Sequence, residues 1–433
     1  MGRSYYTITE ITDYGPFITK LVLPMPVNVT AEAVNPQCFS VYVERKDQKG
    51  EILMLPTSWV EKDIKKPSKG YCVVKDVYPS SQYGRRTEEG EYVTLEMKYG
   101  PNDALSAAIA APNGMNVFVA SDYRVTQIAE VPAEGKKLTG LVFDKCAGNT
   151  MKQAEKFLHG ISSYEDEPLK YGYFVPQTGN GRRPLIIWLH GAGEGGQDPT
   201  IAYAGNKVVN LASDEIQAKF GGAFVLVPQT PTFWMNDGSG EYGRSGKSMY
   251  GKALKALIDE FISRNDAAID TNRIYIGGCS NGGFMTMRMV LDYPDFFAAA
   301  YPVCEALYNE VISDADIEAI KHVPIWFTHS KDDLIVKPEE TAVPTFERLL
   351  KAGAKSVHFS LFDKVVDLHG LFTDEKGEPY TYNGHFSWVY ALNDDCLLDY
   401  DGKPVVEDGK EVSLMAWLAR QRIKYFTLLN SSN

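Results

Sequence analysis

Two patterns of hydrophobic and polar positions divide the chain. Over residues 1 to about 135, short runs alternate polar and apolar side chains, and Pro, Gly, Asn and Asp separate the runs. A period of two is typical of strands with one buried face, so this region predicts an antiparallel sandwich of immunoglobulin-like architecture, without the Cys, Trp, Cys pattern of antibody domains. The expected strands include residues 17–23, 39–44, 70–75 and 92–97.

From about residue 140 the expected strands become short and apolar throughout, and helical patterns lie between them. One such helix, residues 249–263, carries apolar side chains at helical spacing. Strands buried on both faces and separated by helices predict the α/β class, with a mostly parallel sheet and functional groups at the carboxyl ends of its strands. The expected strands are residues 184–189, 223–227, 273–277, 297–301, 324–328 and 357–361.

The length of 433 residues also favours two domains, which we place at residues 1–135 and 136–433. A formal net charge of -12 argues against a nucleic-acid partner, because that binding depends on clustered Lys and Arg. No apolar leader segment opens the sequence and no run approaches the length of a membrane span. We therefore expect no membrane partner and a cytoplasmic protein, or a secreted one if a leader was removed.

The six cysteines are scattered, with neither a Cys-x-x-Cys pair nor finger-like spacing. Free and mostly buried thiols are the expectation, although Cys279 and Cys304 each follow an expected strand and could approach if those strands are neighbours. No zinc-protease, P-loop or calcium-loop motif occurs, so we expect neither a metal nor a cofactor. The cysteines are Cys38, Cys72, Cys146, Cys279, Cys304 and Cys396.

Residues 274–283 predict a strand that breaks into Gly278-x-Ser280-x-Gly282 and runs into a helix over residues 284–293. Strand, sharp turn and helix in this order are typical of a nucleophile elbow. The glycines fit because side chains there would collide with the strand or the helix. A serine hydroxyl attacks a carbonyl only when a positioned base takes its proton, so Ser280 predicts a base and an acid elsewhere in the chain.

The acid should follow the nucleophile, and the base should follow the acid. Asp333 is the expected acid because it lies in an acidic turn directly after the strand over residues 324–328. Asp332 is the alternative acid. Either aspartate could instead cap a helix over residues 338–350, a role that suits Asp332 better.

Five histidines follow Ser280, and His385 is the expected base because it lies in a glycine-preceded loop before an apolar helix. His369 is the alternative base. His322 and His358 begin or lie within expected strands, where a structural role is the ordinary outcome.

The oxyanion of an acyl-transfer intermediate requires N–H donors that are already in place. We expect one donor from the backbone of Asn281, at the start of the elbow helix. The second should come from the loop over residues 190–196, with Ala192 as the first choice and Gly193 as the alternative. His190 is expected to brace this loop rather than take part in the chemistry.

The same loop satisfies a dinucleotide-binding fingerprint, Gly-x-Gly-x-x-Gly over residues 191–196, and Asp214 lies near the distance expected for a ribose contact. The following residues 197–205 do not open an apolar-faced helix that could pack on the sheet, which disfavours this alternative.

Aromatic residues cluster near the expected mouth of the site, and each is more often part of a core. Trp234 and Trp388 are the expected substrate-binding residues, and Phe233 and Phe386 accompany them. The glycine- and serine-rich residues 237–246 fit a mobile flap and a plain connector equally well.

With these motifs placed, residues 170–395 resemble the esterase, polyhydroxybutyrate depolymerase-like and prolyl-oligopeptidase-like branch of the α/β-hydrolases. The amino-terminal residues 14–20 are similar to the immunoglobulin-like domain of certain bacterial esterases. Ser330 is a departure, because many relatives have Gly or Ala after the histidine at this position. The matching motifs are residues 189–194, 278–282, 329–336 and 384–388.

The resemblance implies a metal-free serine carboxylesterase that acts on short-chain or aromatic esters, with feruloyl and acetyl-carbohydrate esterases among its relatives. The expected partner is a small or carbohydrate-linked ester. One alternative is a prolyl-oligopeptidase-like serine peptidase. Another is a carbohydrate-binding protein in which the amino-terminal domain carries the function and the hydrolase domain is inert. That domain fits a roof over the site or a homo-oligomer contact equally well.

Overall fold

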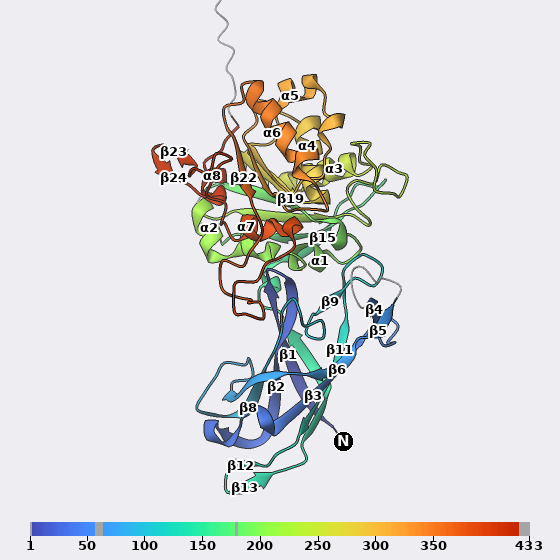
Figure 1. Ribbon diagram of the computed structural model, residues 1–433, viewed down its shortest axis with the longest axis vertical. Coiled ribbons are helices and arrows are strands. Elements are labelled where there is room, and N and C mark those ends of the chain that lie inside the picture. Colours follow the sequence, from blue (N-terminus) through green and yellow to red (C-terminus); the bar gives the residue numbers. More distant parts are fainter. Residues whose placement is uncertain (1, 57–63, 178–180, 424–433) are drawn as a thin grey trace, which may run out of the picture. The chain divides into compact units, whose positions relative to one another are not determined.

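The computed structural model describes residues 2–56, 64–177 and 181–423 (Figure 1). The chain divides into two compact units, Met1–Glu155 with Ala204–Lys207, and Lys156–Tyr203 with Val208–Asn433. The domain boundary expected between residues 135 and 136 stays a prediction. Strand β14 (Val142–Thr150) pairs within the sheet of the first unit.

The first unit is an all-β domain around one eight-stranded sheet with the order β6-β3-β11-β14-β1-β2-β8-β7. Strand β3 alternates buried and half-buried residues along its whole length, as the period of two predicts. The expectation of a purely antiparallel arrangement is wrong at one pair, because β1 runs parallel to β14. The strands of this sheet are β1 (Arg3–Thr12), β2 (Gly15–Thr30), β3 (Phe39–Lys46), β6 (Lys69–Cys72), β7 (Val74–Ser80), β8 (Glu89–Met97), β11 (Ala120–Gln127) and β14.

Three two-stranded ribbons and two short 3-10 helices complete the described part of this unit. They are β4 (Met54–Pro56) with β5 (Lys65–Pro67), β9 (Ile109–Ala110) with β10 (Val117–Phe118), β12 (Val131–Ala133) with β13 (Lys136–Leu138), η1 (Ala31–Ala33) and η2 (Pro36–Cys38). A third 3-10 helix, η3 (Ala154–Lys156), spans the division between the units.

The second unit is built on an eight-stranded sheet with the order β15-β16-β18-β17-β19-β20-β21-β22. Strands β18, β17, β19, β20, β21 and β22 are parallel to one another, and in the described chain β16 runs antiparallel to both of its neighbours, β15 and β18. Every residue of β18, β20 and β21 is buried, which confirms the expectation of a parallel sheet covered on both faces. The strands are β15 (Leu158–Ile161), β16 (Lys170–Phe174), β17 (Arg183–Leu189), β18 (Phe224–Gln229), β19 (Ile269–Cys279), β20 (Ala299–Val303), β21 (Ile325–Ser330) and β22 (Val357–Phe362).

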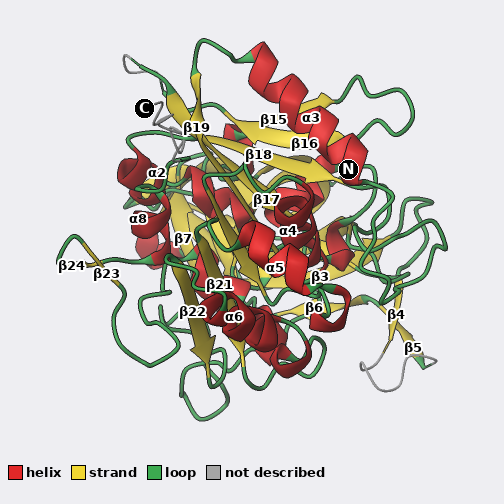
Figure 2. Cartoon of the chain, turned by 90° about the horizontal axis from the view of Figure 1, so that it is seen from above, coloured by secondary structure: helices red, strands yellow, loops and turns green. Residues whose placement is uncertain are grey.

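Helices α3 to α6 lie together over one face of this sheet (Figures 1 and 2), and α2 packs against α8. The expected helix over residues 249–263 is present as α3, which buries its apolar stripe. The helices are α1 (Pro199–Ala204), α2 (Asp214–Phe220), α3 (Gly251–Arg264), α4 (Asn281–Asp292), α5 (Asp314–Ile320), α6 (Ala342–Lys351), α7 (Trp388–Leu392) and α8 (Leu414–Leu418). Shorter elements are η4 (Ala192–Glu194), η5 (Val208–Ala212), η6 (Asn309–Val311), η7 (Pro338–Glu340), η8 (Gly384–Phe386), β23 (Val406–Glu407) and β24 (Lys410–Glu411).

All six cysteines are free, and four of them are buried, as expected. Among the described helices, none combines the length and the apolar character that crossing a membrane requires.

Candidate active site

The elbow is formed as the sequence predicts. Strand β19 ends at Cys279, helix α4 begins at Asn281, and Ser280 between them has φ 56° and ψ -114°, a conformation that L residues rarely adopt. The N–H of Ser280 donates to the carbonyl of Val303 on the adjacent strand at 2.9 Å. A side chain at Gly282 would lie 1.9 Å from the carbonyl oxygen of Leu189, so glycine is a steric requirement there.

The loop after β17 lies directly against the elbow. A side chain at Gly191 would be 3.5 Å from Cys279 Sγ, and Ala192 begins the 3-10 helix η4. The first N–H groups of a helix have no acceptor inside that helix, so the amides of Ala192 and Asn281 are free to meet an external oxygen. The two expected oxyanion donors therefore come from elements in contact, while their catalytic role stays a prediction.

His190 braces this loop, as expected. Its imidazole is fully buried, Nδ1 lies 2.6 Å from the carbonyl of Gly191, and Nε2 accepts the N–H of Thr230 at 3.1 Å. Because Nε2 is an acceptor, the proton is on Nδ1. Burial lowers the pKa of His190 to about 4, so the ring is a neutral strut at physiological pH. The expectation that residues 197–205 open no apolar-faced helix is wrong, because the six-residue helix α1 lies there and buries Ile201, Ala202 and Tyr203.

Asp333 and His385 lie together although 52 residues separate them. Asp333 Oδ2 is 2.7 Å from His385 Nδ1, and Oδ1 accepts the N–H groups of Ile335 and Val336 at 2.9 Å each. Burial alone would raise the pKa of Asp333, but hydrogen bonds from His329 and His385 outweigh it and hold that pKa well below its usual range. The carboxylate is therefore an acceptor only, and His385 Nδ1 carries the proton.

His385 is placed by its own loop. His385 lies in η8, and its backbone N–H donates to the side chain of Asn383 at 2.9 Å. Only 6% of the surface of His385 is exposed. Gly384 is required by the close approach of the acid turn, because a side chain there would lie 2.2 Å from Asp332 Oδ1. The second ring nitrogen, His385 Nε2, has no hydrogen-bond partner in the described part of the chain.

One buried thiol lies between the elbow and the histidine loop. Cys304 contacts the backbone of Ser280 and the hydroxyl of Ser387, two residues after His385. Burial raises the pKa of Cys304 well above its usual value, so it is a neutral packing group. Ser280 Oγ makes no hydrogen bond to any described residue, which leaves it free for a base.

The alternative residues are engaged elsewhere. His369, the alternative base, lies 2.9 Å from Asp395 and is not paired with Asp333. Asp332 does not take its alternative role as a helix cap, because the N-cap of η7 is Lys337 and that of α6 is Thr341. The two histidines expected to be structural are paired with carboxylates, His322 with Asp295 and His358 with Asp399.

The two expected substrate-binding tryptophans are buried. Trp234 has no exposed surface and its ring centre is 5.3 Å from that of His190, while Trp388 is 6% exposed and lies edge-on to His385. Asn281 Oδ1 accepts the N–H groups of Trp234 and Met235, which ties this segment to the elbow. Burial favours the core interpretation of both indoles, and their substrate role stays a prediction.

An exposed aromatic ring near these residues was missed by the sequence reasoning. Tyr242, within the glycine-rich loop, stacks on Phe233 with ring centres 4.0 Å apart and is 61% exposed. Partial desolvation of the side chain, and then the negative charge of Glu194, the last residue of η4, raise the pKa of Tyr242. The ring thus packs on Phe233, whose neighbour Trp234 is bound by the side chain of Asn281. Its only sequence signal was its position in residues 237–246.

Glu305 is a second residue that the sequence did not single out. It follows β20, is 1% exposed, and accepts the N–H of Leu307 on Oε2 at 2.7 Å, while Oε1 has no partner among the described residues. Burial raises the pKa of Glu305 to about 8, so the carboxyl is protonated near neutral pH. Glutamate side chains are normally exposed, so the residue type did not predict that this one is buried.

We expect Glu305→Gln to make the second unit more resistant to alkaline pH. Between pH 4.5 and about 8 the folded protein retains a proton that the unfolded chain releases, so stability falls by about 1.4 kcal/mol per pH unit as pH rises. A neutral amide removes this slope and can still accept the N–H of Leu307. The measurement is urea unfolding followed by tryptophan fluorescence from pH 5 to 9. A stability difference that stays constant over this range contradicts the assignment.

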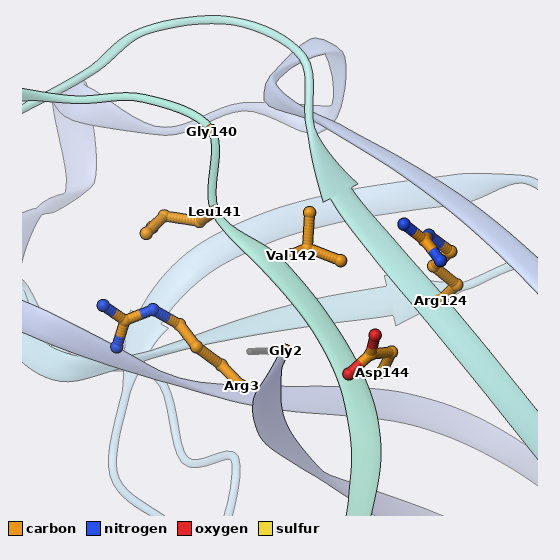
Figure 3. Close-up of a pocket in the computed structure, with 7 residues that line it drawn as sticks. All are labelled: Gly2, Arg3, Arg124, Gly140, Leu141, Val142 and Asp144. Carbon is orange, nitrogen blue, oxygen red and sulfur yellow. The ribbon is translucent and has the colours of Figure 1, made fainter.

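A polar cavity of about 390 Å³ lies in the all-β unit (Figure 3). None of its described lining residues is aromatic, so it offers no ring on which a sugar could stack. It therefore gives no support to the carbohydrate-binding alternative. The cavity is lined by Gly2, Arg3, Arg124, Gly140, Leu141, Val142 and Asp144. Elsewhere in the described chain, no group of three or more His, Cys, Asp or Glu side chains is arranged to hold a metal ion.

The parallel sheet, the elbow and the hydrogen-bonded Asp and His define an α/β-hydrolase. Comparison with known families agrees: residues 4–140 match the esterase Ig-like N-terminal domain, and residues 234–318 match the prolyl oligopeptidase family. The chain thus has the α/β-hydrolase fold and carries a segment that matches an esterase immunoglobulin-like domain, as the resemblance in its sequence indicated.

Its relatives are esterases and polyester depolymerases. A poly(3-hydroxybutyrate) depolymerase of Ralstonia pickettii is 31% identical over 29% of this chain and 27% of that protein, and feruloyl esterase B of Neurospora crassa is 30% identical over 29% and 40%. The chain thus spans less than half the length of these relatives. The crystal structure of a thermostable esterase matches 97% of this chain and 99% of its own, at 25% identity and a TM-score of 0.71.

Proposed function

We propose that the protein is a serine carboxylic-ester hydrolase that works through an acyl-enzyme. The observation that carries the proposal is the 2.7 Å hydrogen bond between Asp333 and His385, in the unit where a strained elbow presents Ser280. Asp333 fixes the tautomer in which Nδ1 is protonated, and this leaves the lone pair of Nε2 to act as the base.

In this mechanism His385 Nε2 accepts the proton of Ser280 as Oγ attacks the ester carbonyl. The oxyanion of the tetrahedral intermediate accepts hydrogen bonds from the amides of Asn281 and Ala192. The intermediate then collapses, His385 gives its proton to the leaving alcohol, and the acyl group remains on Ser280. A water molecule, deprotonated by His385, attacks the acyl-enzyme, and the acid product leaves with the serine restored.

For the substrate we propose short-chain or aromatic esters, including feruloyl esters and acetylated carbohydrates. Feruloyl esterase B and an acetylxylan esterase of Emericella nidulans, 24% identical over 37% of this chain and 51% of that protein, support this range. The exposed ring of Tyr242 also supports it, because it stacks on Phe233, next to the segment that Asn281 binds, and an exposed aromatic ring there is suited to stacking on a planar acyl group.

A fluorophosphonate tests the proposed nucleophile directly. We expect stoichiometric labelling with loss of p-nitrophenyl acetate turnover, and mass spectrometry should find the adduct on the peptide that contains Ser280. An excess of a slowly hydrolysed ester should protect the enzyme. Label on another residue, with activity intact, would refute the assignment of Ser280.

The match to the prolyl oligopeptidase family over residues 234–318 supports a second candidate, a serine peptidase. A peptidase must protonate an amine leaving group, which is a harder step than release of an alcohol. Parallel assays of p-nitrophenyl esters, methyl ferulate, acetylated xylan and proline-containing peptides separate the two. Turnover of peptides but not of esters would favour the peptidase.

A further inference from the structure

A second histidine is bound to the proposed catalytic acid. His329, at the end of β21, is fully buried, and its Nε2 lies 3.0 Å from Asp333 Oδ2 and 2.9 Å from the carbonyl oxygen of Val336. The same Oδ2 atom is bound by His385 Nδ1 at 2.7 Å. One carboxylate oxygen thus lies between two imidazoles.

The partners of His329 fix its tautomer. A carbonyl oxygen can only accept, and the carboxylate of Asp333 is ionised because its pKa is well below the usual range. Nε2 of His329 must therefore carry the proton and share it between these two acceptors. His329 Nδ1 is buried with no partner among the described residues, so a proton there would be a buried donor without an acceptor.

Asp333 then accepts four hydrogen bonds, two on each oxygen. The donors to Oδ1 are the amides of Ile335 and Val336, which belong to the acid turn itself. The donors to Oδ2 are the two histidines, and only His329 links that oxygen to the rigid end of the sheet. A carboxylate held on both oxygens cannot rotate away from His385.

We infer that His329 is a positioning residue for the proposed triad: by donating to Asp333 Oδ2 it fixes the carboxylate and reduces the negative charge that His385 experiences. This inference rests on the proposed function. His329 does not act on the substrate, and its effect reaches the reaction only through Asp333. The titratable groups that face the carboxylate are His329 from β21, His385 from η8, and the neutral thiol of Cys304 after β20.

The test compares His329→Met, which removes the donor, with His329→Gln, whose side-chain amide can place an N–H near the position of Nε2. In the methionine variant the Asp333 carboxylate no longer accepts a hydrogen bond from residue 329. More of its negative charge then acts on His385, and this stabilises the imidazolium. The acidic limb of the kcat/KM profile should therefore move to higher pH. We expect kcat to fall about 10- to 100-fold through misplacement of the base, with KM unchanged. The glutamine variant should keep most of the wild-type kcat, and its acidic limb should lie close to that of the wild type.

A second readout is independent of turnover. The proton on His385 Nδ1 should give a far-downfield resonance in the ¹H NMR spectrum, also in an inactive Ser280→Ala background. His329→Met should shift this resonance and His329→Gln should return it toward its original position. Folding is checked by near-UV circular dichroism in each variant.

The outcomes separate this inference from the proposed function. A folded His329→Met enzyme with an unmoved acidic limb and an unmoved resonance overturns the positioning role, even if kcat is lower. If Ser280→Ala retains normal ester turnover, the proposed function itself fails, and the resonance still reports whether His329 and His385 share the carboxylate.

Discussion

Replacing the proposed nucleophile, Ser280→Ala, should lower kcat for p-nitrophenyl acetate by about 10⁴-fold or more. The hydroxyl is the atom that forms the acyl-enzyme, and no hydrogen bond from Ser280 Oγ to a described residue would be lost. Alanine keeps the Cβ and the backbone bond from Ser280 to Val303, so the elbow should retain its shape. The measurement is steady-state turnover combined with thermal unfolding.

The control is Ser239→Ala in the exposed glycine-rich loop, which should leave kcat within about twofold of the wild type, as for most surface changes. A Ser280→Ala enzyme with an unchanged unfolding temperature and nearly normal turnover would rule out the acyl-enzyme mechanism. An equal loss in both variants would indicate damage that is unrelated to the nucleophile.

The second large effect is expected for Asp333→Asn, with kcat reduced about 10³- to 10⁴-fold. All four groups that contact this carboxylate are N–H donors: the rings of His329 and His385 and the amides of Ile335 and Val336. An asparagine NH₂ group would face two of these donors wherever it points. If it faces the rings, His385 loses the acceptor that selects its reactive tautomer.

The matched control is the neighbouring Asp332→Asn, which removes the same charge one residue earlier. Asp332 is exposed and accepts a hydrogen bond from the Ser330 hydroxyl, which an amide oxygen can also accept. We expect a change of about threefold at most, since exposed charges contribute little. If the Asp332 variant loses as much activity as the Asp333 variant, the identity of the acid is wrong. Kinetics on a common ester substrate decide between them.

Much of the architecture followed from patterns that are local in sequence. Alternation with a period of two predicted the all-β first unit, and short apolar strands separated by helices predicted the parallel sheet, because burial on one face or on both dictates these patterns. The elbow was also a local signal, because the glycines around Ser280 leave room for the neighbouring backbone. In the structure, a side chain at Gly282 would collide with the carbonyl oxygen of Leu189. The loop that contains His385 has a similar glycine, because a side chain at Gly384 would collide with Asp332.

Several features were beyond sequence reasoning because they depend on contacts between distant segments. The parallel pairing of β1 with β14 joins residues about 140 positions apart. The break at Thr341 interrupts a helix that propensity alone would continue. The burial of Trp234 and the exposure of Tyr242 depend on how the loops pack, and neither residue type determines that outcome.

By itself, the sequence of this protein determined its fold class, its elbow and the order of its candidate catalytic residues. These features depend on local steric fit and on the periodicity of burial, and both are set by residues that are close together in the sequence. Only the tertiary structure decided that Asp333 binds His385 rather than His369, that His329 shares the same oxygen atom, and that Glu305 is buried without a charged partner. These outcomes depend on desolvation and on distances of about 3 Å between side chains far apart in the chain, and no linear pattern encodes such distances.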